Sequence, residues 1–178
     1  NLMYEKYIII CFLFVLQLIV KGQDASINSK QIEDLKNSLL TAKEDSTRIF
    51  ILGRLGFTYQ GLNIDSALKY TYAGINLAKE KGNSRMEANI LATLSGIMSQ
   101  QGKFAEALDM LFKSLKIAED NNLTYEIARA NRRLGGVYFD LENYRKAISY
   151  DLIALKLDKE NGFESATIDH IFLANAYD

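Results

Sequence analysis

The sequence contains no proline and no tryptophan, and its 178 residues include one cysteine and one histidine. A lone cysteine excludes a disulfide framework and a cysteine metal site within one molecule. The formal net charge of −1 gives no basic surface for nucleic acid, so we expect this segment to bind none. Abundant alanine, leucine, lysine and glutamate, with only short clusters of turn formers, favour an almost entirely helical protein.

The beginning of the chain has a different character from the rest. An apolar run covers residues 8–20 and is interrupted only by Gln17. A membrane span needs roughly twenty apolar residues, so this shorter run is more typical of the core of a secretory signal peptide. We predict that residues 1–22 are cleaved before Gln23 and that the protein is exported to the periplasm or cell envelope. The alternatives are a membrane anchor, with residues 7–20 in contact with lipid, or a buried soluble helix.

The remainder of the chain repeats itself with a period of about forty residues. Three units carry an alanine at the same place: Ala67, Ala107 and Ala147. Each unit closes with a residue type that readily takes the left-handed conformation at which a helix stops: Gly82, Asn122 and Gly162. Repetition at this period indicates a solenoid. A solenoid offers an extended curved surface, which suits binding another chain better than enclosing a reaction.

Apolar residues recur at helical spacing in segments of about 15–18 residues, separated by short polar breaks. Asp45 with Ser46 gives one helix start signal, and Ser84 with Glu87 gives a capping box. The short breaks leave room only for antiparallel neighbours, and no segment alternates with period two, so we expect helix pairs and no strand. We divide this part into a capping helix within residues 23–45 and a repeat array over residues 46–178, with units 46–83, 84–123, 124–163 and an incomplete 164–178.

Small and large residues alternate where paired helices are expected to approach each other. In each unit a leucine in the first helix precedes a small residue, and a large residue follows three positions later. The second helix carries the matching alanine. Small against large is what close packing of helices requires. We therefore predict a set of repeat-packing residues: Leu55, Gly56, Tyr59, Ala67, Leu94, Ala107, Leu134, Gly135, Tyr138 and Ala147.

The Leu-Gly-x-x-Tyr blocks, the aromatic-x-x-Ala blocks and their spacing resemble the tetratricopeptide repeat (TPR) family from about residue 45 to the end. The chain departs from the family in its period, which is about forty residues instead of thirty-four, and in lacking the usual tryptophan and proline. The longer period resembles the branch found in kinesin light chains and bacterial sensor proteins. The resemblance implies an all-α fold, a right-handed superhelical solenoid of antiparallel helix pairs.

A second resemblance concerns the start of the array. Residues 34–47, followed by repeats, are similar to the amino-terminal region of exported bacterial sensor histidine kinases that carry TPR arrays. No kinase residues are present in this chain. A kinase domain beyond residue 178 is compatible with this resemblance.

Three arginines in the third unit form a candidate binding site. Spacings of three and four place Arg129, Arg132 and Arg133 along one side of a helix. In the TPR family this helix lines the concave groove, so guanidinium groups there suit the carboxylates of a partner peptide. The alternative is a solvated basic face balanced by Glu126 and Asp140. The candidate groove residues are Asn89, Arg129, Arg132, Arg133 and Phe139.

The groove differs from that of chaperone-binding TPR proteins. Those proteins use a lysine and asparagine pair in one unit and further basic residues in the next two. Here Gly53 with Phe57, and Ala92 with Gly96, stand at the corresponding positions. We therefore do not expect binding of chaperone tails.

No arrangement of residues indicates catalysis. His170 has no second histidine to act with, and no phosphate-binding loop or serine nucleophile motif is present. We expect no enzyme in this segment, no cofactor and no metal site; an enzyme with unrecognised chemistry is the third class of function. The partner is predicted to be a protein, a peptide or a neighbouring domain of the same chain, and the incomplete last unit offers a surface for self-association. The chain is then the sensory or coupling part of a longer signalling protein or, alternatively, a free-standing envelope scaffold or assembly factor.

Overall fold

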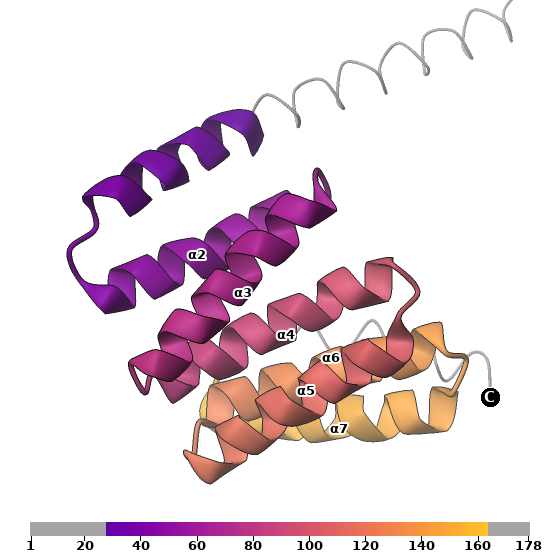
Figure 1. Cartoon of the computed structure of the whole chain (residues 1–178). Coiled ribbons are helices and arrows are strands. Elements are labelled where there is room, and N and C mark those ends of the chain that lie inside the picture. Colours follow the sequence, from indigo (N-terminus) through magenta and orange to yellow (C-terminus); the bar gives the residue numbers. More distant parts are fainter. Residues whose placement is uncertain (1–27, 164–178) are drawn as a thin grey trace, which may run out of the picture. The chain divides into compact units, whose positions relative to one another are not determined.

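The computed structural model describes residues 28–163, and all regular secondary structure in this range is helical (Figure 1). Residues 28–41 form a helix in a compact unit of their own. The second unit contains six helices in the described range: α2 (Asp45–Tyr59), α3 (Ile64–Glu80), α4 (Ser84–Gln100), α5 (Phe104–Asp120), α6 (Thr124–Asp140) and α7 (Tyr144–Asn161). The predicted all-α repeat fold is confirmed. The capping role predicted for the first helix stays a prediction.

The helices of the second unit associate in pairs, α2 with α3, α4 with α5 and α6 with α7. Each pair then packs on the next, because α3 contacts α4 and α5 contacts α6 (Figure 1). The first helices of the pairs, α2, α4 and α6, also contact one another in turn. Among the described residues the second helices, α3, α5 and α7, make no such mutual contacts. The array is therefore curved, with the first helices on its inner side.

Left-handed residues end the helices at the predicted places. The backbone φ angle is +65° at Gly82, +53° at Asn122 and +67° at Gly162. The turn inside a pair uses the same conformation in the second and third units, at Gly102 (φ +70°) and Glu142 (φ +57°). Glycine adopts this conformation freely, whereas a glutamate there strains the backbone. The turns between helices are thus specified by single residues.

The predicted capping box at the start of α4 is wrong. Helix α4 begins at Ser84 itself, and the residue that caps it is Asn83. The Asn83 side-chain oxygen accepts a hydrogen bond from the backbone N–H of Met86 at 3.1 Å. Asparagine immediately before the helix satisfies a free N–H group of the first turn, so the Ser84 hydroxyl is not needed there. Asn63 and Asn143 cap α3 and α7 in the same way.

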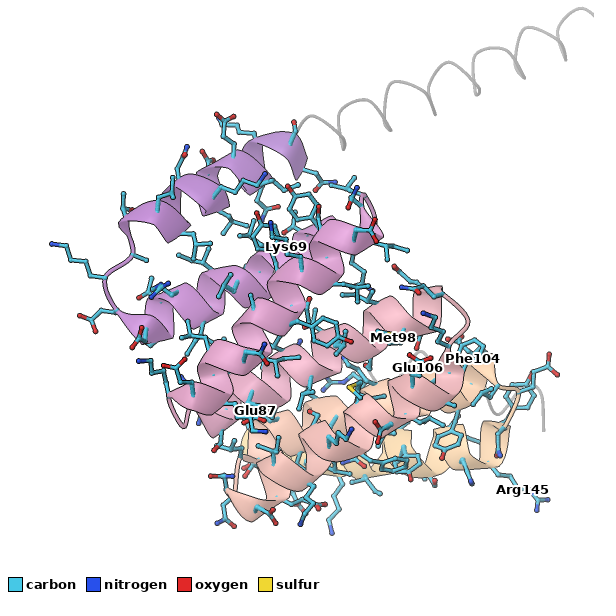
Figure 2. All side chains as sticks on the ribbon, in the orientation of Figure 1. Lys69, Glu87, Met98, Phe104, Glu106 and Arg145 are labelled. Carbon is cyan, nitrogen blue, oxygen red and sulfur yellow. The ribbon has the colours of Figure 1, made fainter. Side chains whose placement is uncertain are left out.

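The core lies between the two layers of helices. The alanines at the repeated position, Ala67, Ala107 and Ala147, are completely buried. A cluster of buried apolar residues joins α4, α5, α6 and α7 across two units, and Met98 of α4 belongs to it (Figure 2). Leu94, Leu134 and Tyr138 lie in the same cluster, and Leu55 is buried in the first unit.

Stacked aromatic rings and glycine residues allow the paired helices to approach each other closely. Tyr59 stacks on Tyr70 with 5.6 Å between ring centroids, and Tyr138 stacks on Tyr150 at 5.4 Å. The backbone of Gly56 lies directly against the Thr71 side chain, and the backbone of Gly135 lies against the Asp151 carboxylate. Neither glycine has room for a β-carbon. Glycine at these two positions is therefore required by the close approach of the helices.

Several predictions fall outside the described residues. They concern the signal peptide over residues 1–22, with Cys11, and the incomplete unit 164–178, with His170. Within residues 28–163 no helix is both long enough and apolar enough to cross a membrane.

Candidate functional site

Two hollows lie side by side along the first helices. The aromatic hollow, between α2 and α4, has a volume of about 300 Å³ and is lined by Phe50, Gly53, Arg54, Phe57, Met86, Asn89, Thr93 and Arg129. The arginine hollow, between α4 and α6, has a volume of about 380 Å³ and is lined by Ser95, Gly96, Ser99, Tyr125, Arg129, Arg132, Arg133, Gly136, Val137 and Asp140. Arg129 borders both hollows, so they form one continuous surface on the inner side of the array.

The aromatic hollow exposes apolar side chains that the fold does not bury. Phe50 is 54% exposed and Phe57 is 50% exposed. The Arg54 guanidinium lies 5.9 Å from the centre of the Phe57 ring, within the range of a cation–π contact. Two large exposed aromatic residues beside each other in a concavity are typical of a surface that contacts another molecule.

The arginine hollow holds half-buried positive charge. Burial first, and then the neighbouring charges of Arg129 and Arg132, lower the pKa of Arg133 to about 10. Burial also lowers the pKa of Arg129, although the Glu126 carboxylate opposes that shift. The Arg133 guanidinium stays charged at pH 7, because its pKa of about 10 remains well above it. Among the described residues no carboxylate lies within 4.0 Å of either arginine.

The absence of a side chain at Gly96 shapes the floor of this hollow. A β-carbon on Gly96 would lie 3.0 Å from Nε2 of Gln60 and 3.2 Å from Nη1 of Arg133. Glycine thus allows side chains from α6 and from the end of α2 to lie across α4. The Ser99 hydroxyl in the same hollow is buried and has no hydrogen-bond partner among the described residues. The hollow therefore combines space, half-buried charge and an unsatisfied polar atom.

The three arginines all line the arginine hollow, but their partners differ. Nη2 of Arg132 donates to Oδ2 of Asp158 on α7 at 2.7 Å, and Asp158 is only 1% exposed. Arg132 therefore joins the two helices of its own pair while it borders the hollow. Arg129 and Arg133 line the hollow and form no ion pair with a carboxylate of residues 28–163.

Asn89 connects the groove to a buried acid. Glu126 of α6 is 5% exposed and is hydrogen-bonded to the Asn89 side chain of α4. Burial raises the pKa of Glu126, and the charges of Arg129 and Arg85 and the hydrogen bond from Asn89 oppose that rise. The predicted alternative, in which Glu126 balances the basic face, therefore applies to Arg129 and not to Arg133.

Phe139, a predicted groove residue, lines neither of the two hollows. Its ring packs edge to face on Tyr144 with 5.5 Å between centroids, and it covers the core cluster. Gly136, Val137 and Asp140 line the arginine hollow from this end of α6 instead. Phe139 is in the last turn of α6, and its ring contacts Tyr144 at the start of α7.

The groove offers both charged and apolar surface. Across residues 28–163 no group of three or more histidine, cysteine or acidic side chains is arranged so that it could hold a metal ion. The comparison with known families then decides the identity. The family profile described as SusR N-terminal TPR domain matches residues 25–160. The chain belongs to this TPR family. The resemblance to tetratricopeptide repeats is thereby confirmed.

Solved structures share the TPR architecture. BtubC (BKLC) from P. vanneervenii matches with a TM-score of 0.70 and 16% identity, over 87% of this chain and 68% of that chain. The apo form of RapI matches with a TM-score of 0.68 and 16% identity, over 88% of this chain and 44% of RapI. At this identity the likeness establishes the fold alone. No curated protein matches the chain. The chain is thus a TPR-type helical scaffold, a fold that is typically non-catalytic and mediates contacts between proteins.

Two acidic residues of the third TPR unit were missed by the sequence analysis. Asp151 and Asp158 of α7 are fully buried, and neither oxygen of Asp151 has a hydrogen-bond partner within residues 28–163. Burial raises the pKa of Asp151 to about 7, and the charge of Arg132 opposes this rise. A comparison of the three units position by position could have identified both aspartates, because the other units have uncharged residues there. The first two units have Thr71 and Leu111 at the position of Asp151. They have Ala78 and Ala118 at the position of Asp158.

Proposed function

We propose that this TPR array is exported and holds a polypeptide partner, or a neighbouring domain of the same chain, in the groove along α2, α4 and α6. The observation that carries the proposal is that the aromatic and arginine hollows share Arg129. One extended segment can therefore meet an apolar and a cationic surface in succession. Each hollow alone is small, and a partner that spans both gains contacts in each.

We further propose that the chain is the sensory or coupling N-terminal part of a longer signalling protein. The description of the matched family as an N-terminal domain supports this proposal. The alternative is a free-standing envelope scaffold or assembly factor. The gene sequence downstream of the codon for Asp178 distinguishes them. An apolar span of about twenty residues followed by a signalling domain supports the first proposal, and a nearby stop codon supports the alternative.

The groove is tested by a capture experiment from an envelope extract. Phe57→Asp places a charge in the aromatic hollow, and we expect it to lose partners that the parent chain retains. Phe112→Asp is the matched control, because Phe112 is 41% exposed on the second helix α5, outside both hollows. If the two variants and the parent recover the same partners in the same amounts, the groove is not the binding surface.

Export is tested by mass spectrometry of the chain made in a bacterial host with its natural amino terminus. The apolar run at residues 8–20 predicts a mature protein that starts near Gln23 in the envelope fraction. Recovery of intact peptides from Met3 to Lys21 in soluble cytoplasmic protein would contradict export. Recovery of those peptides in the membrane fraction would instead support the anchored alternative.

A further inference from the structure

We infer that the outer face of α7 binds an anionic lipid surface. This cationic face lies on the side of the array formed by the second helices, and none of its residues lines the aromatic or the arginine hollow. The inference therefore concerns a surface other than the proposed groove and does not depend on a polypeptide partner. The face consists of the exposed residues of α7 up to its last turn: Arg145, Lys146, Ser149, Leu152, Ile153, Lys156, Lys159 and Glu160.

The repeat provides a reference for this face. From Ala67, Ala107 and Ala147 onward, α3, α5 and α7 have the same order of buried and exposed positions, so their outer faces can be compared position by position. At these positions α3 has two lysines and two acids and a net charge of zero. Helix α5 has two lysines and four acids, which give −2, and α7 has one arginine, three lysines and one acid, which give +3. Of the second helices in the described array, α7 is thus the one with an excess of positive charge.

The acids that neutralise α5 are absent from α7. On α5, Lys113 pairs with Asp109 at 2.7 Å, and Lys116 pairs with Asp120 at 3.2 Å. Both lysines therefore have a carboxylate one turn away on the same helix. At three positions α5 has an acid where α7 has none, and the equivalent residues are Glu106 and Lys146, Asp109 and Ser149, and Glu119 and Lys159.

The positive charge of α7 is not compensated within the described chain. Lys156 lies 3.9 Å from the Glu160 carboxylate, and an ion pair this long and this exposed contributes little. Arg145 and Lys159 form no ion pair within residues 28–163. The cationic face therefore attracts an anionic surface, and this attraction weakens as the salt concentration rises.

Two exposed aliphatic side chains lie between the cations. Leu152 is 51% exposed and Ile153, its neighbour in the chain, is 46% exposed. Arg145 comes two turns before Leu152 and projects into solvent (Figure 2), and Lys156 and Lys159 come one and two turns after it. Apolar side chains flanked by cations on one helix face suit a helix that lies in the plane of a membrane surface, with its apolar residues among the acyl chains.

The residue types favour lipid over an acidic protein. Interfaces between proteins are enriched in arginine and aromatic residues and depleted in lysine, whereas three of the four cations here are lysines and both apolar residues are aliphatic. A lysine is a flexible point charge without the fixed fork of an arginine, so it suits a fluid array of phosphates better than one defined carboxylate. Its stem covers apolar surface while the ammonium group stays at the level of the head groups.

The test uses the full chain with Cys11→Ser, so that one introduced cysteine carries an environment-sensitive fluorophore. Ser149→Cys reports on the cationic face, and Ala73→Cys, exposed on the face of α3 that has no net charge, is the matched control. Vesicles of phosphatidylcholine alone are compared with vesicles that also contain phosphatidylglycerol. We expect a blue shift of the emission at position 149 with the anionic vesicles only, and none at position 73. The readout is specific to the site, so binding of the apolar run at residues 8–20 to either kind of vesicle does not produce it.

Charge and apolar variants then separate the two contributions. Lys156→Gln with Lys159→Gln should raise the vesicle concentration needed for half of the shift about thirtyfold, since each basic residue near an anionic surface contributes about fivefold. Lys113→Gln with Lys116→Gln on α5 is the matched control and should change it less than about twofold. All four lysines are exposed, so the thermal unfolding midpoint should stay that of the parent.

Leu152→Ser with Ile153→Ser keeps the charge and should also lose the blue shift, because the apolar contact with the acyl chains is gone. An equal shift with phosphatidylcholine vesicles, or an equal shift at position 73, would overturn the inference. If polyglutamate at equal charge displaces the vesicles and the Leu152→Ser with Ile153→Ser variant keeps the shift, the face binds an acidic polypeptide and the lipid inference is wrong. None of these results changes the capture experiment with Phe57→Asp, so the proposed groove stands or fails separately.

Discussion

Arg132 of α6 and Asp158 of α7 form an ion pair at 2.7 Å, and the carboxylate is almost completely buried. At the positions equivalent to Asp158 the first two units have Ala78 and Ala118, which are also buried. The third unit therefore replaces a small apolar contact between paired helices by a buried charge pair. Such a pair binds the helices in a defined register, but its net stabilisation is small because both charges lose their hydration.

Breaking this pair from one side should be strongly destabilising. Arg132→Ala leaves the buried Asp158 carboxylate uncompensated, and we expect a loss of about 3–5 kcal/mol in the free energy of unfolding. The double variant Arg132→Met with Asp158→Ala restores the alanine of the other units and should lie within about 1 kcal/mol of the parent or above it. Urea denaturation measures both. A double variant as unstable as the single one would show that Arg132 supports the fold through other contacts.

The Asp151 carboxylate should make stability depend on pH between about 4 and 7. Its pKa is raised by burial from 3.8 to about 7, so the folded chain binds this proton more tightly than the unfolded chain. The stabilisation by the protonated form is complete below pH 3.8 and is lost as the pH rises through about 7. Asp151→Thr reproduces the Gly56–Thr71 contact of the first unit and should gain about 1–3 kcal/mol at pH 8.

The same variant supplies the control for this pH dependence. The difference between Asp151→Thr and the parent should be largest at pH 8 and shrink toward pH 4, in urea titrations at each pH. A constant difference over that range would mean that Asp151 is not the group that titrates.

Substitutions at the two equivalent turn residues, Gly102 and Glu142, should change the free energy of unfolding in opposite directions. Gly102→Ala places a β-carbon on a residue with φ +70° and should cost about 1–2 kcal/mol. Glu142→Gly removes the same strain at the equivalent turn and should stabilise by up to about 1 kcal/mol. Nothing lies within 4 Å of a β-carbon built on Gly102, so the effect is conformational and not steric.

Gly61 provides the matched control for these turns. It occupies the turn of the first pair, has an open surrounding like Gly102, and does not have a left-handed φ. Gly61→Ala should therefore be neutral or should stabilise by about 0.4–1 kcal/mol, because it restricts the unfolded chain. Equal losses at Gly61 and Gly102 would contradict the conformational explanation. Chemical denaturation of the three variants is sufficient.

The buried alanine of the second unit should tolerate no enlargement. Ala107→Leu overpacks the contact between α4 and α5 and should cost about 1–3 kcal/mol, and Ala107→Asp should cost more because it buries an unpaired charge. Ala105→Leu, at an exposed position of the same helix, is the control and should be nearly neutral. Hydrogen exchange should show the greatest loss of protection around the second unit, since solenoid stability is a sum of local and neighbour terms. Uniform loss over the array would contradict this local picture.

The sequence by itself determined the repeat and the secondary structure. The spacing of Ala67, Ala107 and Ala147 and the stops at Gly82, Asn122 and Gly162 sufficed, because helix periodicity and left-handed termination depend on residues close in the chain. The predicted start of α4 failed only by one residue. Asn83 and Ser84 both supply a capping oxygen, and their sequence alone does not decide between them.

Only the tertiary structure decided what each charged side chain does. Arg129, Arg132 and Arg133 look alike in the sequence, yet Arg132 is paired with Asp158, which lies 26 positions further along the chain. The direction of Phe139 likewise depends on Tyr144 of the next helix. Burial and ion pairing depend on contacts between residues of different helices. Patterns of neighbouring residues in the sequence therefore do not predict them. The alignment of the repeats is the part of the sequence that comes closest to predicting the ion pair. It shows that Asp158 stands where the other units have Ala78 and Ala118.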